Sequence, residues 1–160
     1  MIKRVRFFAP SALTFLGGSG ALIVADILLA RVADPDVLHD WIVFRSLIFP
    51  LGTLALLGFD QIIVREPSKA GLFLKPAIPL VVGITAALAV GSYISGYYDN
   101  PHYVFMATLG LAGSGLLFGY LRAKLLFNSA QIARDGWKAT FLLFLLPLHF
   151  VLFLDPEMVV

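Results

Sequence analysis

The chain has 160 residues, of which 59% are hydrophobic and only 14% are charged, and its formal net charge is +2. A soluble domain carries about a quarter charged residues, so this chain lacks the polar groups that cover a soluble surface. The net charge is too small to indicate nucleic-acid binding, and the absence of cysteine excludes a thiolate catalyst, a cysteine-ligated metal and a disulfide. This composition predicts an integral membrane protein.

Long apolar stretches recur along the chain, each bounded by charges, proline or aromatic residues. They cover residues 7–30, 41–64, 76–96, 103–121 and 139–154. About 20 helical residues cross the ~30 Å hydrocarbon core of a bilayer, and the first four stretches reach that length. The fifth is marginal unless Trp137 and Lys138 anchor it at the interface. We therefore expect an all-α bundle of about five transmembrane helices, forming a single domain over residues 1–160.

The first stretch is predicted to remain in the mature protein. Lys3, Arg4 and Arg6 resemble the basic start of a signal peptide, but the apolar run behind them is too long and lacks a clear cleavage site. Strands are a poor alternative to helices throughout, because apolar and polar residues do not alternate within these stretches. Unpaired backbone groups also cost several kcal/mol each in lipid.

Basic residues predict the orientation of the chain, because cytoplasmic loops carry an excess of lysine and arginine. A cytoplasmic N-terminus puts ten of the twelve basic residues inside: Lys3, Arg4, Arg6, Arg65, Lys69, Lys75, Arg122, Lys124, Arg134 and Lys138. It puts six acidic residues outside: Asp34, Asp36, Asp40, Asp99, Asp155 and Glu157. The C-terminus is then expected outside. In the longest inner segment, residues 122–138, an apolar set suggests one face of a helix lying near the membrane surface, with a polar set opposite it. The apolar set is Leu125, Leu126, Ile132 and Ala133, and the polar set is Lys124, Asn128, Gln131, Arg134 and Asp135.

Asp26 and Arg45 are charged positions inside apolar stretches. Because consecutive spans are antiparallel, both are expected ~6–8 Å below the outer boundary, at matching depth. A lone charge near mid-bilayer costs at least ~2.5–3.5 kcal/mol, which pairing or a wet cavity relieves. The alternatives stay open. Asp26 and Arg45 line a substrate path, or their side chains extend to the interface, or Asp26 is paired only with Arg31.

Asp60 and His149 are further candidates with open roles. Asp60 lies near the inner end of the second stretch, within reach of Arg65 and the basic N-terminus. It is therefore either a structural ion pair or cap, or part of the transport path. His149, beside Pro147, is either a proton relay or a hydrogen-bonded packing residue.

Glycines interrupt two of the stretches, at Gly17, Gly18 and Gly20 in the first and at four positions in the fourth. The fourth contains a Gly115–Gly119 pair at the spacing that lets helix backbones approach closely. Close packing or hinge motion explains these positions, and Pro76 and Pro79 are expected to open the third span. The chain shows no metal-ligand spacing, nucleophile motif or acid pair, so we expect no enzymatic activity and no cofactor.

Several short motifs lie between Leu28 and Arg65. An apolar span ends in Leu29-Ala30-Arg31, a turn contains Asp34-Pro35-Asp36, and the next span closes on Leu57-Gly58-Phe59-Asp60 and runs on to Arg65. Leu121-Arg122-Ala123 follows the fourth stretch in a similar manner. These segments resemble the polysaccharide and O-antigen flippases of the multidrug/oligosaccharidyl-lipid/polysaccharide exporter superfamily. The match departs from the family at His39-Asp40-Trp41, where Gly-Tyr or Gly-Phe is usual.

The resemblance implies that the chain moves an undecaprenyl-linked oligosaccharide from the inner to the outer leaflet of a bacterial inner membrane, for polysaccharide or lipopolysaccharide synthesis. Asp26 and Arg45 would line the outer part of the cavity, and Arg65 and Arg122 would lie near its cytoplasmic mouth, where a pyrophosphate approaches. Family members have twelve or more spans in two lobes, so five spans resemble an incomplete N-terminal lobe. A partner lobe or a second copy is then expected. The alternative is a small polytopic scaffold subunit without transport activity.

Overall fold

The computed structural model describes the backbone of residues 2–138 and the side chains of residues 12–31 and 33–138. Within this part of the chain every regular element is helical. The elements are α1 (Ile2–Val32), α2 (Pro35–Leu56), α3 (Phe59–Arg65), the 3-10 turn η1 (Pro67–Lys69), α4 (Ala70–Ile94) and α5 (Pro101–Ala123). Residues 127–138 are also helical. The predicted all-α class is therefore confirmed for the described residues, whereas the expected fifth span and His149 lie outside them.

Four described helical segments are long and apolar enough to cross a membrane. They are Ala12–Arg31, Pro35–Leu56, Pro67–Ile94 and Pro101–Ala123. Large apolar side chains point outward along them, with Ile94 78% exposed and Leu13 69% exposed. Outward apolar side chains suit lipid, because a bilayer removes the need for a polar surface.

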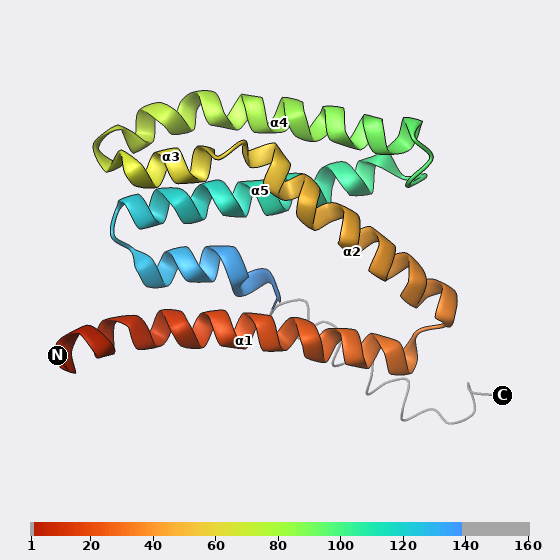
Figure 1. The fold of residues 1–160 in the computed structure, drawn as a ribbon, viewed down its shortest axis with the longest axis horizontal. Helices are drawn as coiled ribbons and strands as arrows, with labels where there is room; N and C mark the ends of the chain where they lie inside the picture. The colour runs from red at the N-terminus through yellow and green to blue at the C-terminus, as the bar shows by residue number, and fades with distance from the viewer. Residues whose placement is uncertain (1, 139–160) are drawn as a thin grey trace. The chain divides into compact units, whose positions relative to one another are not determined.

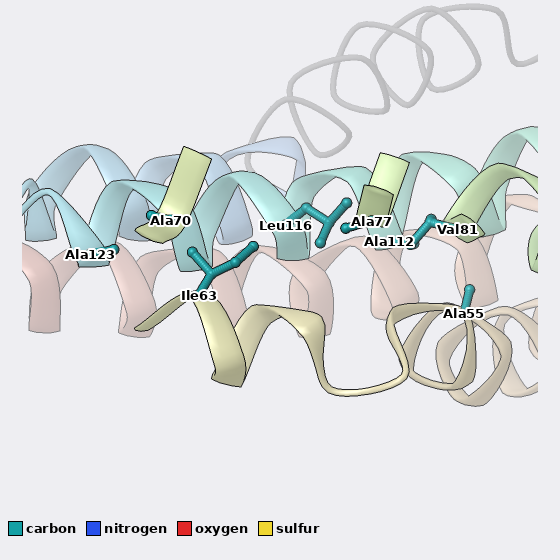
Figure 2. Close-up of a cluster of buried hydrophobic side chains, with 8 residues drawn as sticks. All are labelled: Ala55, Ile63, Ala70, Ala77, Val81, Ala112, Leu116 and Ala123. Carbon is teal, nitrogen blue, oxygen red and sulfur yellow. The ribbon is translucent and has the colours of Figure 1, made fainter. Parts of the chain in front are cut away.

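The chain divides into two compact units. The first comprises Met1–Asp40 with Asp135–Val160, and the second comprises Trp41–Arg134. In the second unit α4 and α5 lie antiparallel, and α3 packs along α5 (Figure 1). Figure 2 shows Ile63 of α3 pointing toward these two helices, in a cluster that also holds Leu116 of α5.

Small residues line the contact between α4 and α5. Ala77, Val81, Thr85 and Ala89 recur every four residues on α4; Val104, Thr108, Ala112 and Leu116 do the same on α5. Val81 clusters with Ala112, and Ala89 clusters with Val104. Thr85 and Thr108 lie between these two pairs, and therefore at the same height along the paired helices α4 and α5. Both are fully buried, and neither hydroxyl has a hydrogen-bond partner among the described atoms.

The second predicted span differs from the structure, which breaks it in two. α2 begins at Pro35 and ends at Leu56, and α3 starts at Phe59. Between them Leu57 has φ 46° and Gly58 has φ 77°, two left-handed residues in succession. A right-handed helix does not pass through such residues, so residues 41–64 do not form one continuous helix. The sequence pattern missed this break because the apolar character continues across it.

Pro76 and Pro79 do not open α4, contrary to the prediction, because the helix begins six residues earlier at Ala70. Each proline removes one backbone donor, but both side chains are exposed on the outside of the helix. Packing against α3 and α5 holds α4 together around them. Interior prolines of this kind are tolerated in membrane helices, where neighbouring groups satisfy the freed carbonyls.

Candidate functional site

Basic residues collect at one end of the second unit. α3 and α5 run in the same direction, so their last turns lie at the same end, where α4 begins (Figure 1). We call this the basic end, and it carries Arg65, Lys69, Lys75, Arg122 and Lys124. All five side chains are exposed. Arg65 and Arg122, predicted from sequence for the cytoplasmic mouth of a substrate path, are thus placed at one end of the unit.

Close packing of α3 on α5 creates this arrangement. A Cβ atom at Gly119 would lie 2.8 Å from the carbonyl oxygen of Asp60, so only glycine lets the two backbones approach so closely. One turn earlier, a Cβ atom at Gly115 would lie 2.6 Å from Leu56 Cδ1. α5 is continuous through both glycines, which supports the packing interpretation of this pair over the hinge.

Asp60 lies on α3 with its backbone against Gly119. Its carboxylate accepts a hydrogen bond of 2.9 Å from the side-chain amide of Gln61. Arg65 follows five residues later, about 140° around the helix at 3.6 residues per turn. Among the described residues Asp60 and Arg65 form no ion pair, which was one form of the structural alternative. A role for Asp60 in a substrate path stays a prediction.

Aromatic rings hold several cations at the C-terminal end of α5. The guanidinium carbon of Arg122 lies 5.3 Å from the centroid of the Phe118 ring, and that of Arg134 lies 4.5 Å from the same centroid. The ammonium of Lys124 lies 5.7 Å from the Tyr120 ring. Cations within about 6 Å of an aromatic centroid are attracted by the ring quadrupole. Phe118 and Arg134 were not predicted as site residues.

The spacing of four between Phe118 and Arg122 was visible in the sequence, because residues four apart meet on a helix. Arg134 carried no comparable signal. It reaches Phe118 only because the chain reverses after α5, through a turn in which Leu125 has φ 60°.

The helix at residues 127–138 buries two of its polar side chains. Gln131 and Asp135 are buried, whereas Ile132 is 57% exposed and Leu126 51% exposed. The sequence placed Gln131 and Asp135 on the polar side of a helix near the membrane surface; they are buried within the protein, and the position of the helix at a membrane surface stays a prediction. Protein covers Gln131 and Asp135, whereas Ile132 points outward.

Asp135 forms a buried ion pair that sequence inspection missed. Its Oδ1 lies 2.6 Å from Lys138 Nζ, and the two side chains are 2% and 15% exposed. Within the first unit, a Cβ atom at Gly18 of α1 would lie 2.9 Å from Asp135 Cβ, so the glycine makes room for this pair. Gly17 and Gly20 meet open space. The exposed pair Lys69–Glu66, at 2.9 Å, is expected to contribute little by comparison.

Asp26 and Arg45 are both half-buried, and each makes contacts of its own. Asp26 lies on α1 in the first unit, and Arg45 lies on α2 in the second. Arg45 follows Phe44, whose ring lies 5.2 Å from that of Tyr98, so this part of α2 lies at the end opposite the basic end. An interaction between Asp26 and Arg45 would join the two units and stays a prediction.

Tyrosines gather at that opposite end, which we call the tyrosine end. Of the five tyrosines in the chain, four lie around the turn from α4 to α5: Tyr93, Tyr97, Tyr98 and Tyr103. Three of them are more than half exposed, and Asp99 is the acidic residue of the turn. Exposed tyrosines are enriched where a membrane meets water.

No protein-family model, curated protein or solved structure matches this chain.

Proposed function

We propose that the chain spans a bacterial inner membrane with its basic end in the cytoplasm. We further propose that it moves a lipid-linked oligosaccharide from the inner to the outer leaflet as part of a longer or multi-subunit transporter. The proposal has two steps, membrane insertion with a defined orientation and translocation, and each step has separate support.

The polarity of the second unit is the observation that carries the first step. The basic end and the tyrosine end are separated by the full length of α4 and α5, which have 25 and 23 residues. At 1.5 Å per residue each helix is about 35 Å long, enough for the ~30 Å hydrocarbon core. Outward apolar side chains such as Ile78 and Val90 lie between the ends. Lysine and arginine favour the cytoplasmic side, which orients the unit.

Translocation is supported by the resemblance of Leu28–Arg65 to the first helical hairpin of the polysaccharide and O-antigen flippases, together with the cations at the basic end. Arg65 and Arg122 are exposed there, where a lipid pyrophosphate in the inner leaflet would meet them. Phosphate is well matched by arginine, whose planar fork donates two parallel hydrogen bonds.

A partner is part of the proposal, because alternating access needs two bodies that move about a shared site. The four described candidate spans supply too few helices for two lobes. A partner lobe or a second copy of the chain would supply the second body. The competing proposal is a polytopic scaffold subunit without transport activity.

The deciding experiment deletes the gene in the source bacterium and measures undecaprenyl-linked repeat units in each leaflet. A flippase component predicts that these units accumulate in the inner leaflet, and that the wild-type gene reverses the accumulation. The variants Arg65→Gln and Arg122→Gln should restore transport poorly, whereas Lys75→Gln, an exposed cation on α4, serves as the matched control. Normal leaflet distribution in the deletion strain would favour the scaffold.

Reconstitution tests the need for a partner. The purified 160-residue chain, shown to be monomeric, is placed in liposomes with a fluorescent lipid-linked sugar. We expect leaflet exchange no faster than in protein-free vesicles. Exchange well above that background would show that the chain transports alone.

A further inference from the structure

The chain reverses direction at the C-terminal end of α5. Leu125 has φ 60°, and the N–H of Leu126 donates a hydrogen bond of 2.9 Å to the carbonyl of Leu121. A left-handed residue followed by a bond back to the last turn is a common way for a helix to end. The next helix then runs back along α5, so that residues 127–134 and the end of α5 lie side by side within the second unit (Figure 1).

The contact between Phe118 and Arg134 shows how far this helix returns. The guanidinium carbon of Arg134 lies 4.5 Å from the centroid of the Phe118 ring. Phe118 precedes Ala123, the last residue of α5, by about 7.5 Å of helix. Because α5 is about 35 Å long, it extends about 2–3 Å beyond each boundary when centred on a ~30 Å hydrocarbon core. Phe118, with the guanidinium beside its ring, then lies about 5 Å inside the hydrocarbon boundary.

The exposed residues of the returning helix change from polar to apolar along its length. Asn128 and Ser129, in the first turn, are exposed. The next exposed side chain is that of Ile132, which is 57% exposed. On α5, Leu117 beside Phe118 is 48% exposed, so both helices direct an apolar side chain outward. This order is expected for a helix that passes from the headgroup region into the hydrocarbon core.

The charged residues of the same helix are covered by protein. Arg134 is half-buried, and the ion-paired side chains of Asp135 and Lys138 are only 2% and 15% exposed. Charges inside a membrane pair with one another or face the protein interior, because contact with lipid is costly. A helix lying along the membrane surface has no such need, since its polar face meets water.

We propose that the helix beginning at residue 127 enters the bilayer beside α5, so that its exposed surface at Ile132 contacts the acyl chains of the lipid. Under the proposed orientation this contact lies in the inner leaflet. A helix lying along the membrane surface, as the sequence suggests, would instead keep residues 127–134 among the headgroups. The inference rests on the membrane-insertion step of the proposed function and does not depend on translocation.

The test measures the depth of single spin labels in the full chain, reconstituted in vesicles of phosphatidylcholine and phosphatidylglycerol. The chain has no cysteine, so Leu126→Cys, Ile132→Cys and Leu117→Cys each carry one nitroxide at an exposed position. Collisions with oxygen and with a water-soluble nickel chelate report the depth of each label below the lipid phosphates. We expect the label at position 132 to lie about 6–9 Å deeper than the label at position 126, because six residues of chain separate them. Its depth should be close to that of the label at position 117.

The outcomes separate this inference from membrane insertion itself. A surface-lying helix would place Leu126 and Ile132 together on its apolar face. Equal depths at these two positions, with a deep label at position 117, would therefore overturn this inference alone. A label at position 117 no deeper than the lipid phosphates would contradict the membrane-insertion step.

Ser129→Cys replaces Leu126→Cys if that variant fails to fold, which circular dichroism and gel filtration report. Ser129 is exposed and lies three residues before Ile132, on a neighbouring position of the same helix face. Its label should be about 4 Å shallower than the label at position 132 if the helix enters the bilayer. A label at position 129 as deep as that at position 132 would again overturn the inference.

Discussion

Single glycines decide how closely the helices of the second unit approach one another. Gly119 is the sharpest case, because the atoms that a Cβ would meet belong to the backbone of Asp60 and not to a flexible side chain. The backbone of Asp60 cannot move aside without shifting the whole of α3, so we expect position 119 to tolerate few side chains larger than that of glycine.

We expect Gly119→Ala to lower the free energy of unfolding by about 1–3 kcal/mol, the range for overpacking a well-packed contact. Gly113→Ala on the same helix is the matched control, since its Cβ would meet nothing within 4 Å. Alanine is more favourable than glycine inside a helix by up to about 1 kcal/mol. Gly113→Ala should therefore leave the free energy of unfolding unchanged or raise it. Thermal unfolding in detergent measures both variants, and equal midpoints would contradict the close contact.

The threonines in the contact between α4 and α5 are the second residue-level feature. Thr85 and Thr108 place hydroxyls without hydrogen-bond partners in a fully buried position. Leaving a buried hydroxyl unpaired costs about 1–3 kcal/mol, whereas an apolar group of the same shape avoids this cost.

Thr85→Val and Thr108→Val are therefore expected to stabilise the protein by about 1 kcal/mol each, because valine keeps the shape and removes the hydroxyl. Ser92→Ala should act in the opposite direction, since Ser92 Oγ donates a hydrogen bond of 2.8 Å to the Ala89 carbonyl. Unfolding midpoints in the same detergent compare the three. Destabilisation by both valine variants would show that the hydroxyls are paired in solution.

At the scale of elements, the break between α2 and α3 is the main departure from simple hairpins. Two left-handed residues end α2 and let α3 turn onto α5, where Ile63 is buried. Glycine adopts this conformation without strain, but Leu57 does so at a cost of about 1–2 kcal/mol. The contacts of α3 with α5 offset that cost.

Substitutions at the break should have opposite effects. Gly58→Ala is expected to destabilise by about 1–2 kcal/mol, although its Cβ would meet open space, because φ 77° strains any residue with a side chain. Leu57→Gly should stabilise by about 1 kcal/mol through relief of the same strain. Gly71→Ala, at an open helical position on α4, controls for the general effect of losing a glycine. A stabilising Gly58→Ala would show that the break is not formed.

At the scale of the whole molecule, the testable property is the membrane topology, that is, the side of the membrane on which each loop lies. Because the basic end and the tyrosine end lie at opposite ends of α4 and α5, fusions placed there should report opposite sides of the membrane. Reporters after Ser68 and after Leu125 should be cytoplasmic, and reporters after Asp36 and Asn100 should be outside. Reporters at Ser68 and Asn100 on the same side would contradict a membrane-spanning α4.

Sequence alone determined the helical class, the positions of the long apolar segments and the separation of basic from acidic loops. These properties follow from composition and order along the chain, because a bilayer selects for uninterrupted apolar length and for the charge of the flanking loops. The helices Pro35–Leu56 and Pro101–Ala123 overlap the second and fourth predicted spans for this reason. The packing role of Gly115–Gly119 was likewise among the predicted alternatives.

Only the tertiary structure decided what depends on neighbours distant in sequence. Hydrophobic character continues through Leu57 and Gly58, so nothing local distinguished the break from an unbroken span. α3 is held by α5, where Gly119 meets Asp60 from 59 residues further along the chain. The convergence of Arg122 and Arg134 on Phe118, and the burial of Asp135 against Gly18, likewise depend on which helices meet. Spacing along one helix places residues on a shared face, but contacts between helices are set by packing, which no single segment encodes.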